Sequence, residues 1–365
     1  MTDSADSIDT SGVGIVPEAI DTPGVIDVFC GIGGLTHGFF KEDFKILGGI
    51  DVDPSCKYAF ETNNKAPFVN KSIEDVKPDE VSALFGECKT KILIGCAPCQ
   101  PFSMYNRKKS ENDKWKLLRD FSRLVSDIRP DIVSMENVPQ LCHHRVFSEF
   151  VRDLKKAGYT VSQYVVFCPD YGIPQRRRRL VLFASKFGEV KLLPKTHSPE
   201  NYKKVKNAIF KLRPIKCGEA DPKDPLHRSQ KLSPLNLARV RNTPEGGAWQ
   251  TWDDSLKLKC HKKKKGHSFR AVYGRMRWDD LGSTITTQSF KLGTGRFGHP
   301  EQDRAISIRE AALLQTFPKY YKFVRDQSDI TFVELSRHIG NAVPVKLGRV
   351  IAKSIKRHLE QIDNE

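Results

Sequence analysis

The chain has 365 residues, of which 39% are hydrophobic and 28% charged, and its formal net charge at pH 7 is +16. This composition is typical of a soluble globular protein with room for one large domain and a smaller one, and it excludes fibrous and low-complexity chains. The sequence has no apolar run of membrane-spanning length and no signal-peptide pattern at its start, so we expect a cytoplasmic protein.

The charge is unevenly distributed along the chain. Residues 1–22 contain five acidic residues and no Lys or Arg, and their small, aperiodic composition predicts a disordered acidic tail. Residues 186–305 contain 26 Lys and Arg against 12 Asp and Glu, a surplus that suggests a polyanion partner. A solvated lysine-rich face is the alternative interpretation of this surplus.

From residue 23 to about 185, short apolar runs alternate with helical periods. The runs "VIDVF", "FKILGGID", "KILIGC", "PDIVSMENV" and "RLVLFAS" predict buried strands, and "VFSEFVRDLKKAG" predicts a helix that ends at Gly158. Strands that alternate with helices predict an α/β fold with a mostly parallel, doubly wound sheet.

The sequence pattern changes from about residue 190 to 305. Prolines punctuate short segments there, and the run "HKKKKGH" interrupts them, which predicts a separate, loop-rich domain. The stretch "STITTQ" alternates like a strand. Helical periodicity returns in "SIREAALLQTFP" and again in "VKLGRVIAKSIKRHLEQI".

A glycine turn lies between the first predicted strand and a helix, in "VIDVFCGIGGLTHGF". Gly31, Gly33 and Gly34 allow the backbone to approach a ligand closely at a helix N-terminus. Asp51 follows Gly31 by twenty residues, with Asp53 nearby, and an acid there accepts hydrogen bonds from ribose hydroxyls. The spacing fits a nucleoside-bearing cofactor, either a dinucleotide or S-adenosylmethionine; a tight turn without a ligand is the alternative.

Two thiols follow the strand "KILI" in "GCAPCQPFS". The nine cysteines are odd in number and follow no framework spacing, which favours a reducing compartment and free thiols. A metal site would need further ligands, and the sequence offers none at a suitable spacing. A redox-active pair of cysteines usually lies at the start of a helix in a smaller domain. We therefore interpret Cys99, on the loop beside Pro98, as a nucleophile at the end of a strand, and Cys96 as a small core residue.

Two further motifs point to the same edge of the sheet. Glu136 and Asn137 end another buried strand, where a free carboxylate is costly unless it has a task. Four arginines precede the strand "RLVLF", and strand geometry places Arg176 and Arg178 on one side and Arg177 and Arg179 on the other. A solvated phosphate-binding surface is the alternative for all four.

These motifs, with "GIDVDP", "ISIREAALLQTFP" and "IGNAVP", occur in the order found in the DNA cytosine carbon-5 methyltransferase family. The chain resembles that family over about residues 25–348, apart from a variable segment near 190–270. The resemblance implies a Rossmann-like sheet that binds S-adenosylmethionine and a second, smaller target-recognition domain across a DNA cleft. The resemblance also favours a prokaryotic modification enzyme, which would be paired with a restriction endonuclease or act alone.

The resemblance divides the chain into five parts. Residues 1–22 are the tail, residues 23–199 the catalytic and cofactor-binding domain, and residues 200–305 the target-recognition DNA-binding domain. Residues 306–330 would be a hinge segment, and residues 331–365 a C-terminal return that completes the catalytic domain. We expect no metal and no membrane partner, and we expect a monomer that acts on double-stranded DNA in the cytoplasm, at the nucleoid.

Residue roles follow the family motifs. Cys99 resembles the nucleophile that adds to ring position 6 of a flipped-out cytosine, and Glu136 the acid that contacts the base. Asn137 is expected to brace that pocket, and the pattern Gln-x-Arg-x-Arg selects Arg177 and Arg179, with Arg179 at the base carbonyl. The residues implied to line the cofactor site are Phe29, Gly31, Gly33, Leu35, Asp51, Ile73, Pro98, Asn341 and Val343. Where the family often has an acid before an apolar residue, this chain has Ser72 before Ile73.

The predicted DNA contacts are less specific. Arginines can read guanine edges, while lysines mostly meet phosphates. The expected DNA-binding residues are Gln100, Ser103, Arg176, Arg178, Arg275 and Arg277. The lysine run 262–265 is interpreted as a phosphate-facing or disordered loop.

Three other functions compete with this one. A transfer-RNA branch of the same family typically carries a Cys-Phe-Thr motif, which this sequence lacks. A silent DNA-binding protein on the same fold would have lost the thiol or the acid, and both residue types are present. A nicotinamide-dependent dehydrogenase is suggested by the glycine turn alone.

Overall fold

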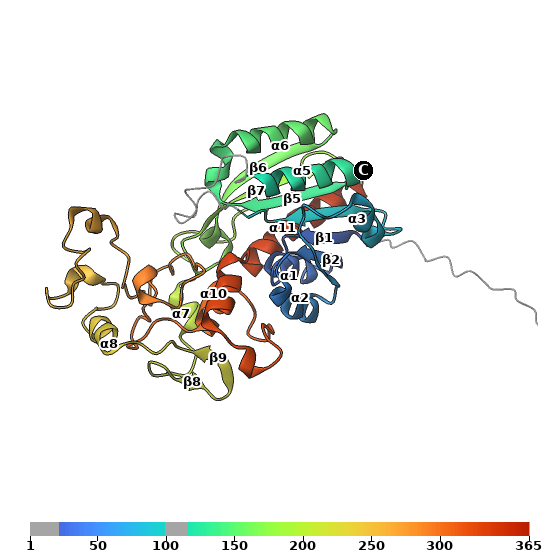
Figure 1. Ribbon diagram of the computed structural model, residues 1–365. Helices are drawn as coiled ribbons and strands as arrows, with labels where there is room; N and C mark the ends of the chain where they lie inside the picture. Colours follow the sequence, from blue (N-terminus) through green and yellow to red (C-terminus); the bar gives the residue numbers. More distant parts are fainter. Residues whose placement is uncertain (1–21, 99–114, 365) are drawn as a thin grey trace, which may run out of the picture.

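The structure is a computed structural model that describes residues 22–98 and 115–364. Its centre is a seven-stranded sheet in the order β3-β2-β1-β4-β5-β7-β6 (Figure 1). The strands are β1 (Gly24–Val28), β2 (Lys45–Asp51), β3 (Phe68–Asn70), β4 (Lys91–Gly95), β5 (Ile132–Asn137), β6 (Thr160–Phe167) and β7 (Arg178–Ser185). The first five strands pair in parallel, whereas β7 runs antiparallel to both β5 and β6. The expected α/β fold with a mostly parallel sheet is confirmed.

Helices cover both faces of the sheet, because the central strands bury side chains on both sides. In β1, for example, Val25 belongs to one apolar core and Ile26 to the other. The first core is covered by α1 (Gly34–Phe40), α2 (Lys57–Asn64) and α11 (Val345–Ile362), and the second by α3 (Pro78–Phe85), α5 (Lys116–Ile128) and α6 (Arg145–Lys156). Helix α6 ends as predicted, at Gly158, which has a φ of +89°.

The region between β7 and residue 307 has little regular structure, as its prolines predict. It contains α7 (Val205–Ile209), β8 (Ala220–Asp221), β9 (Asp224–Arg228) and α8 (Pro234–Arg241), joined by turns and short 3-10 segments. An aromatic cluster holds part of it together: Trp249 stacks on His261 with ring centroids 4.3 Å apart, and the Arg239 guanidinium lies over the rings of Trp252 and Tyr273. The expected strand at 283–288 does not form. The loop-rich character expected of this region is confirmed, whereas its assignment as a separate domain stays a prediction.

Buried ion pairs tie this region to the C-terminal part of the chain. Helix α9 (Ile308–Leu314) starts at a capping box, in which the Ser307 hydroxyl accepts a hydrogen bond from the Glu310 backbone at 3.0 Å. Burial alone would raise the pKa of the Glu310 carboxyl, but the Arg304 guanidinium, 2.7 Å away, lowers it to about 2. The Arg309 guanidinium lies 2.7 Å from the Asp224 carboxylate, which connects α9 to β9. Helix α10 (Phe332–Asn341) then leads into α11.

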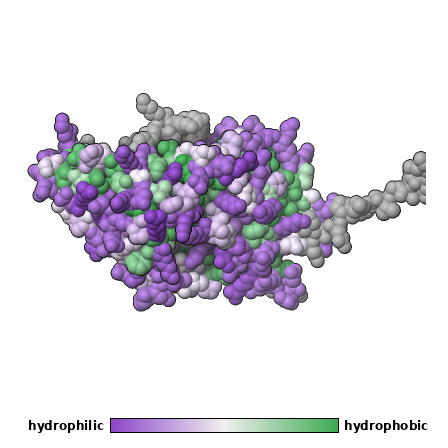
Figure 2. Space-filling model, turned by 90° about the horizontal axis from the view of Figure 1, so that it is seen from below, coloured by the Kyte–Doolittle hydropathy of each residue, from purple (hydrophilic) through white to green (hydrophobic). Residues whose placement is uncertain are grey.

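The surface is mainly polar. Figure 2 shows a largely hydrophilic face in the view from below, with apolar side chains in separate areas. Among the described helices, none has the length and apolar character needed to span a membrane. Large exposed apolar side chains occur singly along the chain, from Val52 to Val333, as is normal for a protein surface.

The contact between α1 and α11 gives a stability prediction. A Cβ atom on Gly348 would lie 2.7 Å from the Leu35 carbonyl oxygen and 3.2 Å from the Gly38 Cα, and these are backbone atoms that cannot turn away. We expect Gly348→Ala to lower the free energy of unfolding in urea by about 1–3 kcal/mol, although alanine is the better helix former. Arg357→Ala, at an exposed position of the same helix, should change it by less than about 0.5 kcal/mol. Equal stabilities for both variants would contradict this account of the helix crossing.

Candidate active site

Polar side chains from several strands meet at one edge of the sheet. The strands β1, β2, β4 and β5 all end there because they are parallel, and β7 begins there because it is antiparallel, with Asn137 opposite Leu180. In open α/β sheets, ligands bind outside the carboxyl ends of the strands. The predicted site residues at this edge are Phe29, Asp51, Pro98, Glu136, Asn137 and Arg179.

Glu136 is a buried acid at this edge, and its side chain is only 2% exposed. Its Oε1 atom lies 2.9 Å from the Arg179 Nε atom. Its Oε2 atom accepts a hydrogen bond from the Cys96 thiol at 2.9 Å. A buried carboxylate needs a charged or hydrogen-bonding partner: Oε2 has the hydrogen bond from Cys96, whereas Oε1 meets the charge of Arg179 without a hydrogen bond.

Asn137 connects the end of β5 to the loop after β4. Its side-chain amide donates to the Ala97 carbonyl oxygen at 3.0 Å, and its Oδ1 atom accepts from the Val138 backbone at 2.9 Å. Pro98 follows Ala97 directly and is exposed. The bracing role expected for Asn137 thus has a contact to support it. The predicted nucleophile Cys99, with Gln100 and Ser103, lies outside the described residues.

The arginine run alternates in exposure as strand geometry predicts: Arg176 and Arg178 are exposed, while Arg177 is 3% exposed and Arg179 is half-buried. Arg177 donates to the carbonyl oxygens of Ile285 at 3.2 Å and Ala342 at 3.4 Å. Burial, followed by the neighbouring charge of Arg179, lowers the pKa of its guanidinium to about 10. Arg177 therefore lies beneath the site and holds two distant segments of the chain together.

The two exposed arginines have different neighbours. Arg176 forms an ion pair with Asp280 at 2.6 Å, and the Arg178 guanidinium lies 4.8 Å from the centre of the Phe167 ring. Both stand on the open side of the arginine run, where the side chains are free of the core. Their predicted contacts with DNA stay predictions.

The glycine turn after β1 has unusual backbone geometry. Phe29 has a φ of +63°, and its backbone N–H donates to the Ile50 carbonyl oxygen at 2.8 Å. Gly31 and Gly33 also have positive φ angles, of 49° and 81°. A Cβ on Gly33 would lie 2.2 Å from the Asn64 side chain, whereas a Cβ on Gly31 would meet nothing within 4 Å among the described residues. Gly33 thus serves packing, and Gly31 borders space that the described residues leave open.

The end of β2 completes this turn. The Asp51 carboxylate accepts hydrogen bonds from the backbones of Gly31 at 2.8 Å and Asp53 at 2.9 Å, and burial raises the pKa of its carboxyl. Val52, which sequence reasoning missed, is 67% exposed. An exposed apolar side chain beside a carboxylate and an open glycine fits the base and ribose of an adenosine group. The feature of the sequence that could have indicated Val52 is its position directly after Asp51.

Other predicted cofactor residues lie deeper. Leu35, Ile73 and Val343 are each 4% exposed and belong to the apolar cores, and Asn341 is exposed at the end of α10. A Cβ on Gly34 would lie 2.5 Å from the Val343 carbonyl oxygen. The C-terminal return therefore passes directly over the start of α1. The proposed contacts of these residues with a cofactor stay predictions.

Sequence reasoning also missed Asp27, the last residue but one of β1. Its Oδ2 atom accepts a hydrogen bond from the Thr36 hydroxyl at 2.5 Å, whereas its Oδ1 atom is buried without a hydrogen-bond partner. Burial raises the pKa of its carboxyl to about 8.

One predicted DNA contact is wrong. Arg275 is 4% exposed, and its five N–H groups donate to the carbonyl oxygens of Val240, His299 and Gln302 and to the Asp303 carboxylate. It has no donor left for DNA and instead ties the loops of the second region together. Arg277, two residues later, is exposed and stays a candidate.

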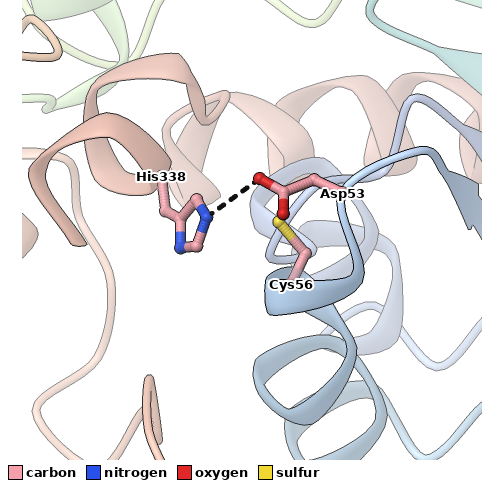
Figure 3. Close-up of side chains that lie close together, drawn as sticks. All are labelled: Asp53, Cys56 and His338. Atoms are coloured by element: carbon pink, nitrogen blue, oxygen red, sulfur yellow. Dashed lines mark hydrogen bonds and ion pairs between the residues drawn. The ribbon is translucent and has the colours of Figure 1, made fainter. Parts of the chain in front are cut away.

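A second polar cluster lies between the turn after β2 and α10. Within the described residues, Asp53, Cys56 and His338 place their possible metal-binding atoms within 4.8 Å of one another (Figure 3). However, Asp53 already forms an ion pair with Arg337 at 2.8 Å, and the ring of His338 lies 3.1 Å from the Ser55 hydroxyl. Burial also raises the pKa of the Cys56 thiol, which disfavours the thiolate that binds metals. The cluster thus works as a polar link between the cofactor edge and α10.

The chain resembles known proteins over nearly its full length. A family model described as C-5 cytosine-specific DNA methylase matches residues 24–357. The chain is 54% identical over 339 residues to the type II methylase M.HgiDII of Herpetosiphon aurantiacus, which covers 92% of this chain and 96% of that protein. It is 30% identical over 355 residues to the type II methyltransferase M1.BsuMI of Bacillus subtilis, covering 90% and 79%.

Solved structures show the same fold. A DNA modification methyltransferase encoded within an E. coli prophage superimposes with a TM-score of 0.71 at 20% identity, covering 93% of this chain and all of that one. A DNMT2 mutant of Spodoptera frugiperda gives a TM-score of 0.63 at 16% identity, covering 92% and 100%. The family match spans every element of the edge described above. The chain therefore belongs to the C-5 cytosine-specific DNA methylases, enzymes that use S-adenosylmethionine as methyl donor.

Proposed function

We propose that the chain methylates carbon 5 of a flipped-out cytosine within a short sequence of duplex DNA, with Cys99 as the nucleophile. The observation that carries this proposal is the pair Glu136–Arg179, 2.9 Å apart at the sheet edge. Asn137, next to Glu136, holds the loop that leads to Cys99 by its bond to Ala97. An acid, a cation and the described chain up to Pro98, directly before Cys99, support this proposal at one edge of the sheet.

Each residue has a chemical reason to be there. Carbon 5 of cytosine is a poor nucleophile until the Cys99 thiolate adds to ring position 6 and gives carbon 5 enamine character. Negative charge develops on the ring during this addition. A protonated Glu136 at ring nitrogen 3 would neutralise it, and Arg179 at the carbonyl oxygen would stabilise it further. After methyl transfer, the carbon-5 proton is lost to solvent, the electrons of that bond restore the C5–C6 double bond, and Cys99 leaves as the thiolate, which frees the product.

S-adenosylmethionine, when bound, supplies an electrophilic methyl group. We propose that Asp51 accepts hydrogen bonds from its ribose, that Val52 covers one face of its adenine, and that the backbone at Gly31 approaches it closely. The open space at Gly31, the exposure of Val52 and the partly engaged Asp51 carboxylate support this assignment. A carboxylate has about four acceptor positions, so Asp51 can keep its two backbone contacts.

The second region is proposed to bind DNA. A base inside a duplex cannot reach Cys99, so the target must swing out at a cost of a few kcal/mol. The exposed side chains Arg176, Arg178 and Arg277 can offset this cost at the phosphates. The lysine run is exposed at 262–264, beside Phe269, which is 52% exposed. We therefore assign residues 200–305 to target recognition, 306–330 to a hinge and 331–365 to the C-terminal return.

The cellular role follows from the same proposal. The relatives named type II favour a modification enzyme that protects DNA from a restriction endonuclease. We propose that the protein acts as a monomer on double-stranded DNA in the cytoplasm, at the nucleoid.

Replacing the nucleophile tests the reaction. We expect Cys99→Ser to lower methyl transfer from labelled S-adenosylmethionine to duplex DNA by at least about 1000-fold, because a hydroxyl adds poorly to the ring. Cys142→Ser is the matched control, since Cys142 faces α6 rather than the site. Bisulfite sequencing would identify one short methylated motif. Label in transfer RNA but not in duplex DNA would contradict the proposed substrate.

The cofactor assignment has its own test. Asp51→Asn keeps the shape of the side chain but removes its charge, so we expect the Kd for S-adenosylmethionine, measured by calorimetry, to rise about tenfold or more. Asp43→Asn, at an exposed position with a φ of 65° that asparagine tolerates, should leave this Kd unchanged. An unaltered Kd in Asp51→Asn would place the ribose elsewhere.

The two arginines of the second region should behave differently. We expect Arg277→Ala to weaken binding to duplex DNA and to lower the slope of log affinity against log salt concentration by the amount of about one phosphate contact. Its thermal stability should be unchanged. Arg275→Ala should instead lower the free energy of unfolding by about 2–4 kcal/mol, because several buried carbonyl oxygens lose their donor. The reverse pattern would contradict the assignment of Arg275 as structural.

A further inference from the structure

Cys96 contacts the acid of the proposed site. Its thiol donates a hydrogen bond to Glu136 Oε2 at 2.9 Å, and the Arg179 guanidinium lies 2.9 Å from Oε1. The hydrogen-bond donor and the cation come from different parts of the sheet, since Cys96 directly follows β4 and Arg179 lies in β7, and Oε1 meets the charge of Arg179 without a hydrogen bond. The carboxyl group is therefore held from both sides.

The backbone of Cys96 is itself held in place. Its N–H donates to the Val28 carbonyl oxygen at 3.4 Å, which continues the pairing of β4 with β1. Just before it, Gly95 leaves no room for movement, because a Cβ there would lie 2.9 Å from the same Val28 oxygen. The side chain packs against the first apolar core and is half-buried. The sequence-based interpretation of Cys96 as a core residue is thus incomplete.

We infer that Cys96 is a positioning residue, whose thiol sets the orientation of the Glu136 carboxyl toward the target base. The inference rests on the proposed function. A carboxyl held only by Arg179 can turn about its last side-chain bond, which is a broad torsion. The hydrogen bond from the Cys96 thiol to Oε2 restricts this rotation. Correct orientation of the acid matters because small errors in geometry are costly in rate.

Filling space is the competing explanation, and three variants separate the two. Cys96→Ala removes the donor and little volume, whereas Cys96→Ser retains a donor of similar size. We expect Cys96→Ala to lower kcat for duplex DNA about two- to tenfold, as fits the loss of one hydrogen bond. The KM for DNA, the Kd for S-adenosylmethionine and the Tm should stay unchanged, and Cys96→Ser should regain most of the rate. Cys142→Ala is the control for removing a half-buried thiol elsewhere.

A double-mutant cycle tests whether Cys96 acts through Glu136. Single-turnover rates with excess enzyme would be compared for Glu136→Ala and for the double variant Cys96→Ala/Glu136→Ala. We expect the two rates to be equal, because the thiol has no acid left to orient. A further loss in the double variant would show that Cys96 acts independently of Glu136 and would overturn the inference. So would full activity of Cys96→Ala, or equal losses in Cys96→Ala and Cys96→Ser.

The outcome for the wild type separates this inference from the proposed function. A wild-type protein that transfers no methyl group to duplex DNA overturns the proposed function, and the inference with it. An active wild type with an unaffected Cys96→Ala variant overturns the inference alone.

Discussion

The ion pair between Glu136 and Arg179 depends on the direction of a single strand. Because β7 is antiparallel to β5, its first residues lie beside the last residues of β5, with Asn137 opposite Leu180 and Glu136 opposite Val181. A parallel β7 would carry Arg179 to the opposite edge of the sheet and leave Glu136 buried without its cation. An unpaired buried carboxylate costs several kcal/mol. The chemistry of the edge and the stability of the sheet thus depend on the same change of direction.

The segment directly before β7 also holds distant parts of the chain in place. Gln175, which is fully buried, donates to the Leu314 carbonyl oxygen and accepts from the Ile285 backbone, each from a distant segment. Arg177 adds contacts to Ile285 and Ala342. The second region and the C-terminal return therefore both attach next to the residue that faces Glu136. A displacement of either one would be transmitted to Arg179 through two residues of strand.

Local patterns predicted most of the fold but not its directions. The apolar runs located the strands, and Gly158 marked the end of α6, since these signals are contained in a few consecutive residues. The antiparallel course of β7 could not be predicted, because an apolar run buried on both faces reads the same in either direction. The expected strand at 283–288 was wrong: the isolated backbone bridge to the arginine segment is at Gly282, and Thr284 and Ile285 contact that segment through hydrogen bonds that involve side chains.

The same limit applies to single residues of the site. Arg275 and Arg277 look equivalent in the sequence, yet one fills all five of its donors inside the protein and the other is exposed. Cys96 resembled a core residue because its partner, Glu136, is forty residues away and on another strand. Motif resemblance indicated the acid and the arginine pair. What each side chain can do depends on its burial and its partners, and both are set by the tertiary structure.

The edge of the sheet that is assigned to the cofactor, around the glycine turn and Asp51, is built from both ends of the chain. The start of α1 touches the backbone at Val343, α1 crosses α11 where Gly38 meets Gly348, and Arg337 reaches the Asp53 carboxylate. These contacts join segments about 300 residues apart, and closing a loop of that length costs entropy. The glycine turn at Gly31 is held by the nearer residues Ile50 and Asp51. The side of the cofactor edge formed by the C-terminal return is completed only when α10 and α11 dock, which links binding competence to the folding of the whole chain.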